Sequence, residues 1–168
     1  MIRQAIISEC GNYRYRLQRR WGAADAKPCV FVMLNPSTAD AEQDDPTIRR
    51  CIGFAEKLGF TTLEVVNLFA WRAKSPKALL SVGPDRDPCG VHNQRAFVEV
   101  LAKPGMIVCA WGAHGGHLGQ DQTALGWIDQ YNDTDAPVVA LGLTKGGQPR
   151  HPLYLPSDAR PVPFGGAA

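Results

Sequence analysis

The sequence lacks several features that would place it in a familiar class. Its 168 residues contain no run of about 18 apolar residues, and the opening MIRQAIISECG is too short and too polar for a signal peptide. The five cysteines are odd in number and form no C-x-x-C, so neither a zinc knuckle nor a disulfide framework is indicated. No internal repeat, Walker A pattern or G-x-G-x-x-G pattern occurs. We expect a cytoplasmic monomer with one domain over residues 1–168, no bound cofactor and no membrane association.

Neither positive nor negative charge is in large excess. The formal net charge is +2, which by itself is too small to argue for a nucleic-acid partner. Arginines gather near the start of the chain, at Arg14, Arg16, Arg19 and Arg20, but such clusters are ordinarily solvated surface.

Apolar runs of strand length alternate with segments of helical periodicity. The strand-like runs cover residues 28–34, 62–68, 105–111 and 136–143, and the helical segments cover 46–58, 91–103 and 118–131. The stretch AIISECGNYRYRLQRRW precedes them and is typical of a hairpin with its turn at Gly11-Asn12. This alternation predicts a three-layer α/β/α domain with a four-stranded parallel sheet in the order 2-1-3-4, preceded by an N-terminal β-hairpin.

Polar and glycine-rich segments follow each predicted parallel strand. They read LNPSTAD, NLFAWR, WGAHGGH and GGQPRHPLYL in chain order. Because ligands of parallel sheets bind at the carboxyl ends of the strands, these segments predict a site at one edge of the sheet.

Three side chains of these segments are candidate site residues. The Asn35 amide offers two donors and an acceptor that can hold a water molecule, and Pro36 favours an extended conformation for it. Asn67 ends a strand, where its amide suits the edge of a nucleobase, and His151 can donate to an anionic leaving group. A plain turn, a structural amide and an exposed loop histidine are the respective alternatives.

A second set of residues suggests phosphate or metal chemistry. The Gly146-Gly147 pair permits close approach of the backbone to a phosphate, and Ser37 and Arg150 add donors nearby. Asp40, Glu42, Asp44 and Asp45 with His114 and His117 are a candidate set of metal ligands, so a metal-dependent phosphohydrolase is an alternative function. Helix capping explains Asp45, and helix-dipole complementarity explains Asp44, without any metal.

The order of these segments resembles the uracil-DNA glycosylase superfamily. The matching pieces are Leu34-Asn35-Pro36-Ser37, Asn67, Trp111-Gly112-Ala113 and the late segment HPLYL that begins at His151. The strings LNPSTAD, DPTIRRC and NLFAWRA also resemble an uncharacterised bacterial and phage family marked by LNPSTAD.

The resemblance implies a role for each matching residue. Asn35 would position the attacking water, Asn67 would read a flipped base, and His151 would bind the oxygen of the departing base. Leu155 falls where the superfamily has a leucine that wedges into the base stack, and Phe69 is the candidate for base stacking. The implied function is a DNA glycosylase-like hydrolase that removes uracil or another modified base from DNA. A non-catalytic nucleic-acid or nucleotide-binding module on the same fold is the alternative.

Overall fold

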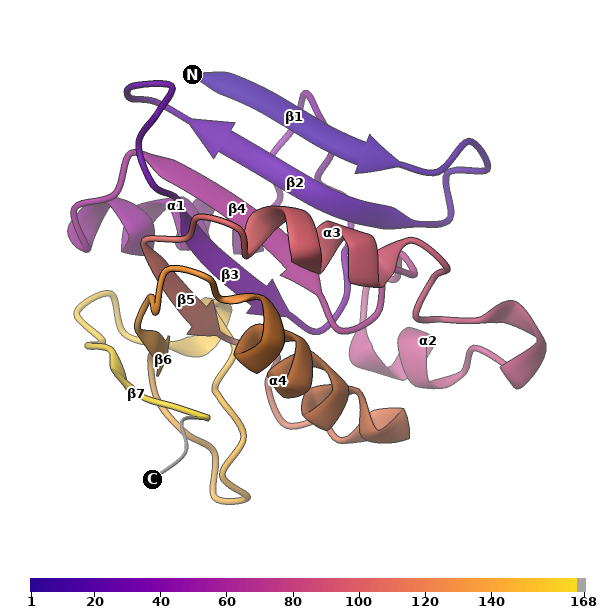
Figure 1. The fold of residues 1–168 in the computed structure, drawn as a ribbon. Helices are drawn as coiled ribbons and strands as arrows, with labels where there is room; N and C mark the ends of the chain where they lie inside the picture. The colour runs from indigo at the N-terminus through magenta and orange to yellow at the C-terminus, as the bar shows by residue number, and fades with distance from the viewer. Residues whose placement is uncertain (166–168) are drawn as a thin grey trace.

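The computed structural model describes residues 1–165, which contain one mixed sheet of seven strands (Figure 1). Its strands lie side by side in the order β1-β2-β4-β3-β5-β6-β7. Their bounds are β1 Ile2–Ile7, β2 Arg14–Arg20, β3 Cys29–Met33, β4 Thr62–Asn67, β5 Met106–Cys109, β6 Val138–Ala140 and β7 Val162–Pro163. The expectation of one domain over 1–168 stays a prediction, and residues 166–168 lie outside the described part.

The four strands predicted from the apolar runs form the parallel centre of this sheet. β4, β3, β5 and β6 are neighbours in that order, which is the order expected among them. The expectation of a four-stranded sheet is wrong, because antiparallel strands extend it on both sides. The N-terminal hairpin of β1 and β2 pairs with β4 through β2, and the C-terminal tail, for which no strand was predicted, supplies β7 beside β6. Both additions cover backbone edges that would otherwise stay unpaired.

Helices cover both faces of the sheet, in agreement with the predicted three layers (Figure 1). The α-helices are α1 Pro46–Lys57, α2 Pro76–Leu80, α3 Asn93–Val100 and α4 Gln120–Tyr131, and three short 3₁₀ turns are η1 Pro84–Arg86, η2 His117–Gly119 and η3 Pro152–Tyr154. α1, α3 and α4 fall within the predicted helical segments, whereas α2 lies outside them. In residues 1–165 no helix is both long and apolar enough to span a membrane.

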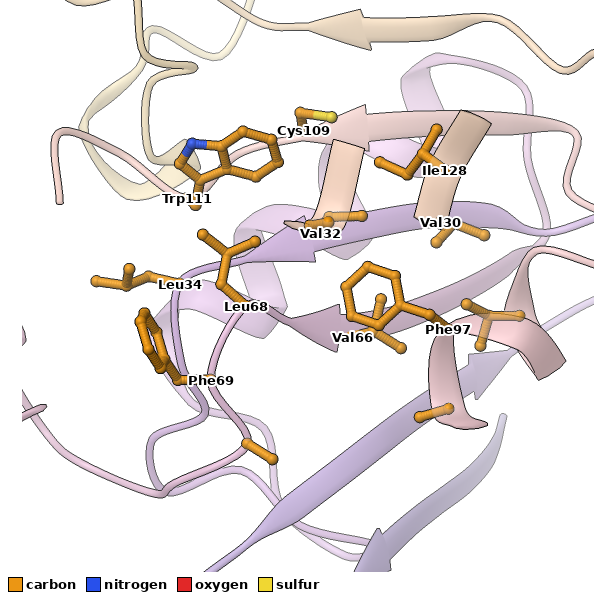
Figure 2. Close-up of a cluster of buried hydrophobic side chains, with 14 of the residues drawn as sticks. Val30, Val32, Leu34, Val66, Leu68, Phe69, Phe97, Cys109, Trp111 and Ile128 are labelled. Carbon is orange, nitrogen blue, oxygen red and sulfur yellow. The ribbon is translucent and has the colours of Figure 1, made fainter. Parts of the chain in front are cut away.

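The strand β3 shows how the core forms on both faces. Successive side chains of a strand point to opposite faces. Val30 and Val32 therefore pack with α3 and α4 residues such as Phe97 and Ile128, as Figure 2 shows. Cys29, Phe31 and Met33 face the other way and pack with α1 residues. A central strand buried on both faces explains why its sequence is apolar without alternation.

Candidate functional site

A cleft of about 560 Å³ opens at the carboxyl ends of the parallel strands. It is formed by the loops that follow β3, β4, β5 and β6, together with the first turn of α1. The polar and charged side chains that line it are Arg14, Asn35, Ser37, Thr38, Asp45, Thr47, Asn67, Lys74, Ser75, His114, Thr144, Arg150, His151 and Tyr154. The cleft thus brings together Asn35, Asn67 and His151, which lie far apart in the sequence.

Asn67 is the last residue of β4 and stands opposite Met33 of β3. Its side chain is only 1% exposed, and neither Oδ1 nor Nδ2 has a hydrogen-bond partner among residues 1–165. Its backbone oxygen is held by the Nδ2 of Asn93, which donates to it at 2.8 Å. Buried amides are nearly always paired, so an unpaired amide that lines a cleft points to a partner from outside the chain.

Asn35 follows β3 and is oriented by the neighbouring loop. Its Nδ2 donates to the carbonyl oxygens of Pro36 at 3.0 Å and Ala73 at 2.9 Å. Both amide hydrogens are then engaged, and Oδ1 accepts no hydrogen bond from the described residues. The group that Asn35 offers to the cleft is therefore an acceptor, which suits the binding of a water molecule.

His151 is fixed in one tautomer by the turn that follows it. Its Nδ1 accepts a hydrogen bond from the backbone N–H of Leu153 at 3.2 Å. Burial lowers the pKa of His151, and the nearby Asp45 carboxylate opposes this shift. The ring is therefore neutral at neutral pH and carries its proton on Nε2 as a donor. Arg50 of α1 secures this turn by donating to the carbonyl oxygens of Pro152, at 3.3 Å, and Leu155.

Arg14 is a lining residue that the sequence did not suggest. In a regular β-strand Arg14 would alternate with Tyr13 and Tyr15 and would point to the face opposite theirs. The pairing of β1 with β2 shifts between Ile6 and Ile7, so that Tyr15 is skipped and Arg14 faces the opposite side from Arg16. A β-bulge commonly re-aims a side chain in this way. Burial lowers the pKa of Arg14 to about 10, so its guanidinium still carries its charge at neutral pH.

Two further residues were also missed, Tyr154 and Lys74. Tyr154 is 75% exposed, and its ring centroid lies 5.8 Å from that of His151. It belongs to the HPLYL segment, so its position beside His151 was a signal that the sequence did contain. Lys74 lines the same cleft from the loop before α2, where no pattern distinguishes it from other surface lysines.

Three acidic residues of the 38–45 loop, Asp40, Asp44 and Asp45, accept hydrogen bonds from within the protein. Asp40 Oδ1 accepts from the backbone N–H groups of Glu42 and Gln43, both at 2.8 Å, and these bonds lower the pKa of Asp40. Asp44 Oδ1 accepts from Arg19 Nε at 2.7 Å. Asp45 caps α1 as expected, because its Oδ1 accepts from Ile48 N–H at 2.9 Å. Of these acids, only Asp45 lines the cleft.

The structure does not bring together the candidate ligands of the metal-dependent alternative. His114 lines the cleft, but the ring of His117 packs 5.5 Å from that of Phe69 instead. Within residues 1–165 no group of three or more histidine, cysteine, aspartate or glutamate side chains is placed to hold a metal ion.

Four of the expected site residues do not line the cleft. Phe69 is 0% exposed in the core, so it offers no open face for stacking, and Leu155 is 5% exposed, so it cannot act as a wedge where it stands. Gly146 and Gly147 form the exposed tip of a turn closed by the bond from Gly147 N–H to the Thr144 oxygen. Ser37 and Arg150, in contrast, do line the cleft.

The chain is a mixed α/β protein with a cleft at the carboxyl ends of its parallel strands. The chain belongs to the family described as "Protein of unknown function (DUF1643)", whose model matches residues 14–153. This match includes the candidate residues Asn35, Asn67 and His151 and ends before Tyr154. No curated protein and no solved structure matches the chain.

Proposed function

We propose that the cleft binds a nucleobase through Asn67 and hydrolyses the N-glycosidic bond of uracil or another modified base in DNA. The observation that carries the proposal is Asn67, a residue that is 1% exposed, whose side-chain Oδ1 and Nδ2 have no hydrogen-bond partner among residues 1–165, and which lines the same cleft as Asn35 and His151. A nucleobase edge presents donors and acceptors side by side, so it suits an amide of this kind.

Asn35 and His151 are suited to stabilise the two opposite charges that develop during such a reaction. Breaking an N-glycosidic bond develops positive charge on the sugar and negative charge on the departing base. The free Oδ1 of Asn35 can orient a water molecule, and its Nδ2 is held by Pro36 and Ala73. The Nε2–H of a neutral His151 can donate to the base oxygen as charge develops there.

Base release from DNA tests this proposal directly. A panel of oligonucleotides with deaminated and modified bases is incubated with the protein and with the variants Asn35→Ala and His151→Ala. We expect release of at least one base by the wild type and a loss of about 10²-fold or more in each variant, the usual range for such catalytic groups. Circular dichroism should show the fold unchanged. If no base is released from any substrate, the hydrolase proposal fails.

The buried positions of Phe69 and Leu155 favour a second candidate, a binding module without catalysis. A flipped base in DNA is ordinarily stabilised by stacking and by a side chain that fills the gap, and neither residue is exposed for these tasks. A module of this kind would bind nucleic acid or a nucleotide in a salt-sensitive way, and binding would survive Asn35→Ala. Binding without base release would favour this candidate.

A further inference from the structure

Arg14 is a buried cation that uses little of its hydrogen-bonding capacity. A guanidinium has five N–H donors. Among residues 1–165 it makes one side-chain hydrogen bond, from Nη1 to the Ala39 oxygen at 2.9 Å, while Nε is buried without a partner. The residue is 2% exposed and lines the cleft. A buried charge without a partner is costly, so its partner is expected in whatever fills the cleft.

The Asp45 carboxylate opposes the lowering of the Arg14 pKa by burial, but its oxygens accept hydrogen bonds from other groups. Asp45 is the single carboxylate among the lining residues within 1–165, and its oxygens accept from the N–H groups of Ile48 at 2.9 Å and Ala39 at 3.3 Å. No ion pair within the described residues joins Arg14 to Asp45. Lys74 and Arg150 also line the cleft, so its cations outnumber its acids.

We infer that Arg14 forms an oxyanion subsite beside Asn67, which binds a carboxylate or phosphate group of the ligand. The two residues come from the neighbouring strands β2 and β4 and are among the most buried polar residues of the cleft. A guanidinium with free N–H groups binds the two oxygens of such an anion in parallel. The inference rests on the proposed function in one respect, which is that the anion belongs to the molecule whose base contacts Asn67.

The burial of Arg14 limits which anionic groups can reach its guanidinium. Phosphates inside a DNA backbone are ordinarily contacted by exposed cations, and a residue that is 2% exposed does not reach them at the surface. The oxyanion must therefore be a group that enters the cleft. Either it is a carboxylate carried by the base itself, which fits the hydrolase, or it is the terminal phosphate of a free mononucleotide, which fits the nucleotide-binding candidate and not a hydrolase that acts on DNA.

Two matched ligand pairs test the subsite and identify the source. The first pair is deoxyuridine and its 5′-monophosphate, and the second is uracil and uracil-6-carboxylate. Dissociation constants are measured by titration calorimetry for the wild type and for Arg14→Gln. In one pair we expect the anionic member to bind at least about tenfold more tightly, and the preference should disappear in the variant. Equal affinities within both pairs, or a preference that persists in Arg14→Gln, would overturn the inference.

Arg14→Lys and Arg20→Gln are the control variants. Arg14→Lys keeps the charge but loses the planar guanidinium, so the preference should fall without vanishing, even if Arg14→Gln does not fold. Arg20→Gln changes an arginine of the same strand that does not line the cleft and whose Nη1 donates to the Ala24 oxygen, so the preference should match the wild type. An unchanged preference in Arg14→Lys contradicts the inference.

The same measurements separate failure of the subsite from failure of the proposed function. If no base or nucleoside binds but inorganic phosphate raises the melting temperature of the wild type and not of Arg14→Gln, the subsite stands and base recognition fails. If uracil or deoxyuridine binds in a way that depends on Asn67 and neither pair shows an anion preference, base recognition stands and the subsite fails.

Discussion

Arg19 and Arg14 lie on the same strand and contact the same loop, but they differ in how many of their side-chain donors form hydrogen bonds. Arg19 is 0% exposed and donates to the Asp44 carboxylate, at 2.7 Å, and to several backbone oxygens, including those of Asp40 and Gln43. Arg14 is 2% exposed and, within residues 1–165, its side chain makes one hydrogen bond, to the Ala39 oxygen. Arg19 therefore holds the 38–45 loop against the sheet, whereas Arg14 keeps most of its donors for the cleft.

Two asparagines repeat this contrast. The Nδ2 of Asn93 donates to the backbone oxygens of Asn67 and Leu68 at the end of β4. The side-chain Oδ1 and Nδ2 of Asn67, in contrast, have no hydrogen-bond partner among the described residues. Five buried side-chain atoms of residues 1–165 lack partners, and three of them belong to Arg14 and Asn67. The other two, in Thr62 and Asn93, do not line the cleft. Unpaired polar groups are thus concentrated at the site, at a cost in stability.

The largest effect is expected for Arg19→Gln. The variant leaves the Asp44 carboxylate and the loop oxygens without their buried donor, which should lower the free energy of unfolding by about 3–5 kcal/mol. Urea denaturation followed by circular dichroism measures this change. If Arg19→Gln lowered the free energy of unfolding by less than Arg14→Gln does, the proposed difference between a structural Arg19 and a ligand-binding Arg14 would be contradicted.

A smaller effect of opposite sign is expected for Asn67→Leu. Replacing two unpaired buried polar atoms by apolar ones should raise the free energy of unfolding by about 1–2 kcal/mol, while ligand binding is lost. Asn93→Leu is the matched control, and it should destabilise because it removes two donated hydrogen bonds. The melting temperatures of the three proteins give the comparison, and destabilisation by Asn67→Leu would show that its amide is satisfied in the folded protein.

Arg14→Gln should change stability little. The loss of the hydrogen bond to Ala39 is offset by removal of a buried charge without a partner, so the free energy of unfolding should change by less than about 1 kcal/mol. The same urea titration as for Arg19→Gln measures it. A loss as large as that of Arg19→Gln would mean that Arg14 is also a structural residue.

The smallest effect is a dependence of stability on pH through His151. Burial lowers its pKa in the folded protein below the usual 6.5, so the unfolded chain binds more protons as the pH falls. The contribution of His151 to stability is therefore fully present above about pH 6.5 and declines as the pH drops through the range between its unfolded and folded pKa values.

The variant His151→Asn should remove this part of the pH dependence. His114→Asn, at an exposed position of the same cleft, should retain it because His151 is still present. Melting temperatures between pH 5 and pH 8, the range in which histidine changes charge, give the comparison. Equal slopes in the wild type and His151→Asn would contradict a lowered pKa for this residue.

The sequence predicted the elements that depend on local pattern. The apolar run of β3, the capped start of α1 at Asp45-Pro46 and the hairpin at Gly11-Asn12 all occur where expected. Because the carboxyl ends of parallel strands meet at one edge, the same pattern also anticipated that Asn35, Asn67 and His151 would lie together. The number of strands in the sheet was predicted wrongly because the periodicity of a strand does not show which other strands pair with its edges.

Features set by long-range contacts were not predictable from local pattern. Phe69 and Leu155 look like accessible residues of loop segments, and only the packing of the core buries them. Asp40 and Asp44 look like candidate metal ligands, but Arg19 and the backbone of their own loop use their oxygens.

The sequence alone thus determined the helices α1, α3 and α4, the parallel strands and the edge of the sheet where the cleft lies, because each follows from the spacing of neighbouring residues. Tertiary structure decided which polar groups remain free in that cleft. The bulge at Tyr15 turns Arg14 inward, and the loop bonds that satisfy Arg19 leave Arg14 with most of its donors unused. Whether a buried polar group has a hydrogen-bond partner depends on residues that folding brings together from distant parts of the chain. The spacing of residues along the sequence does not show which of them come within hydrogen-bonding distance.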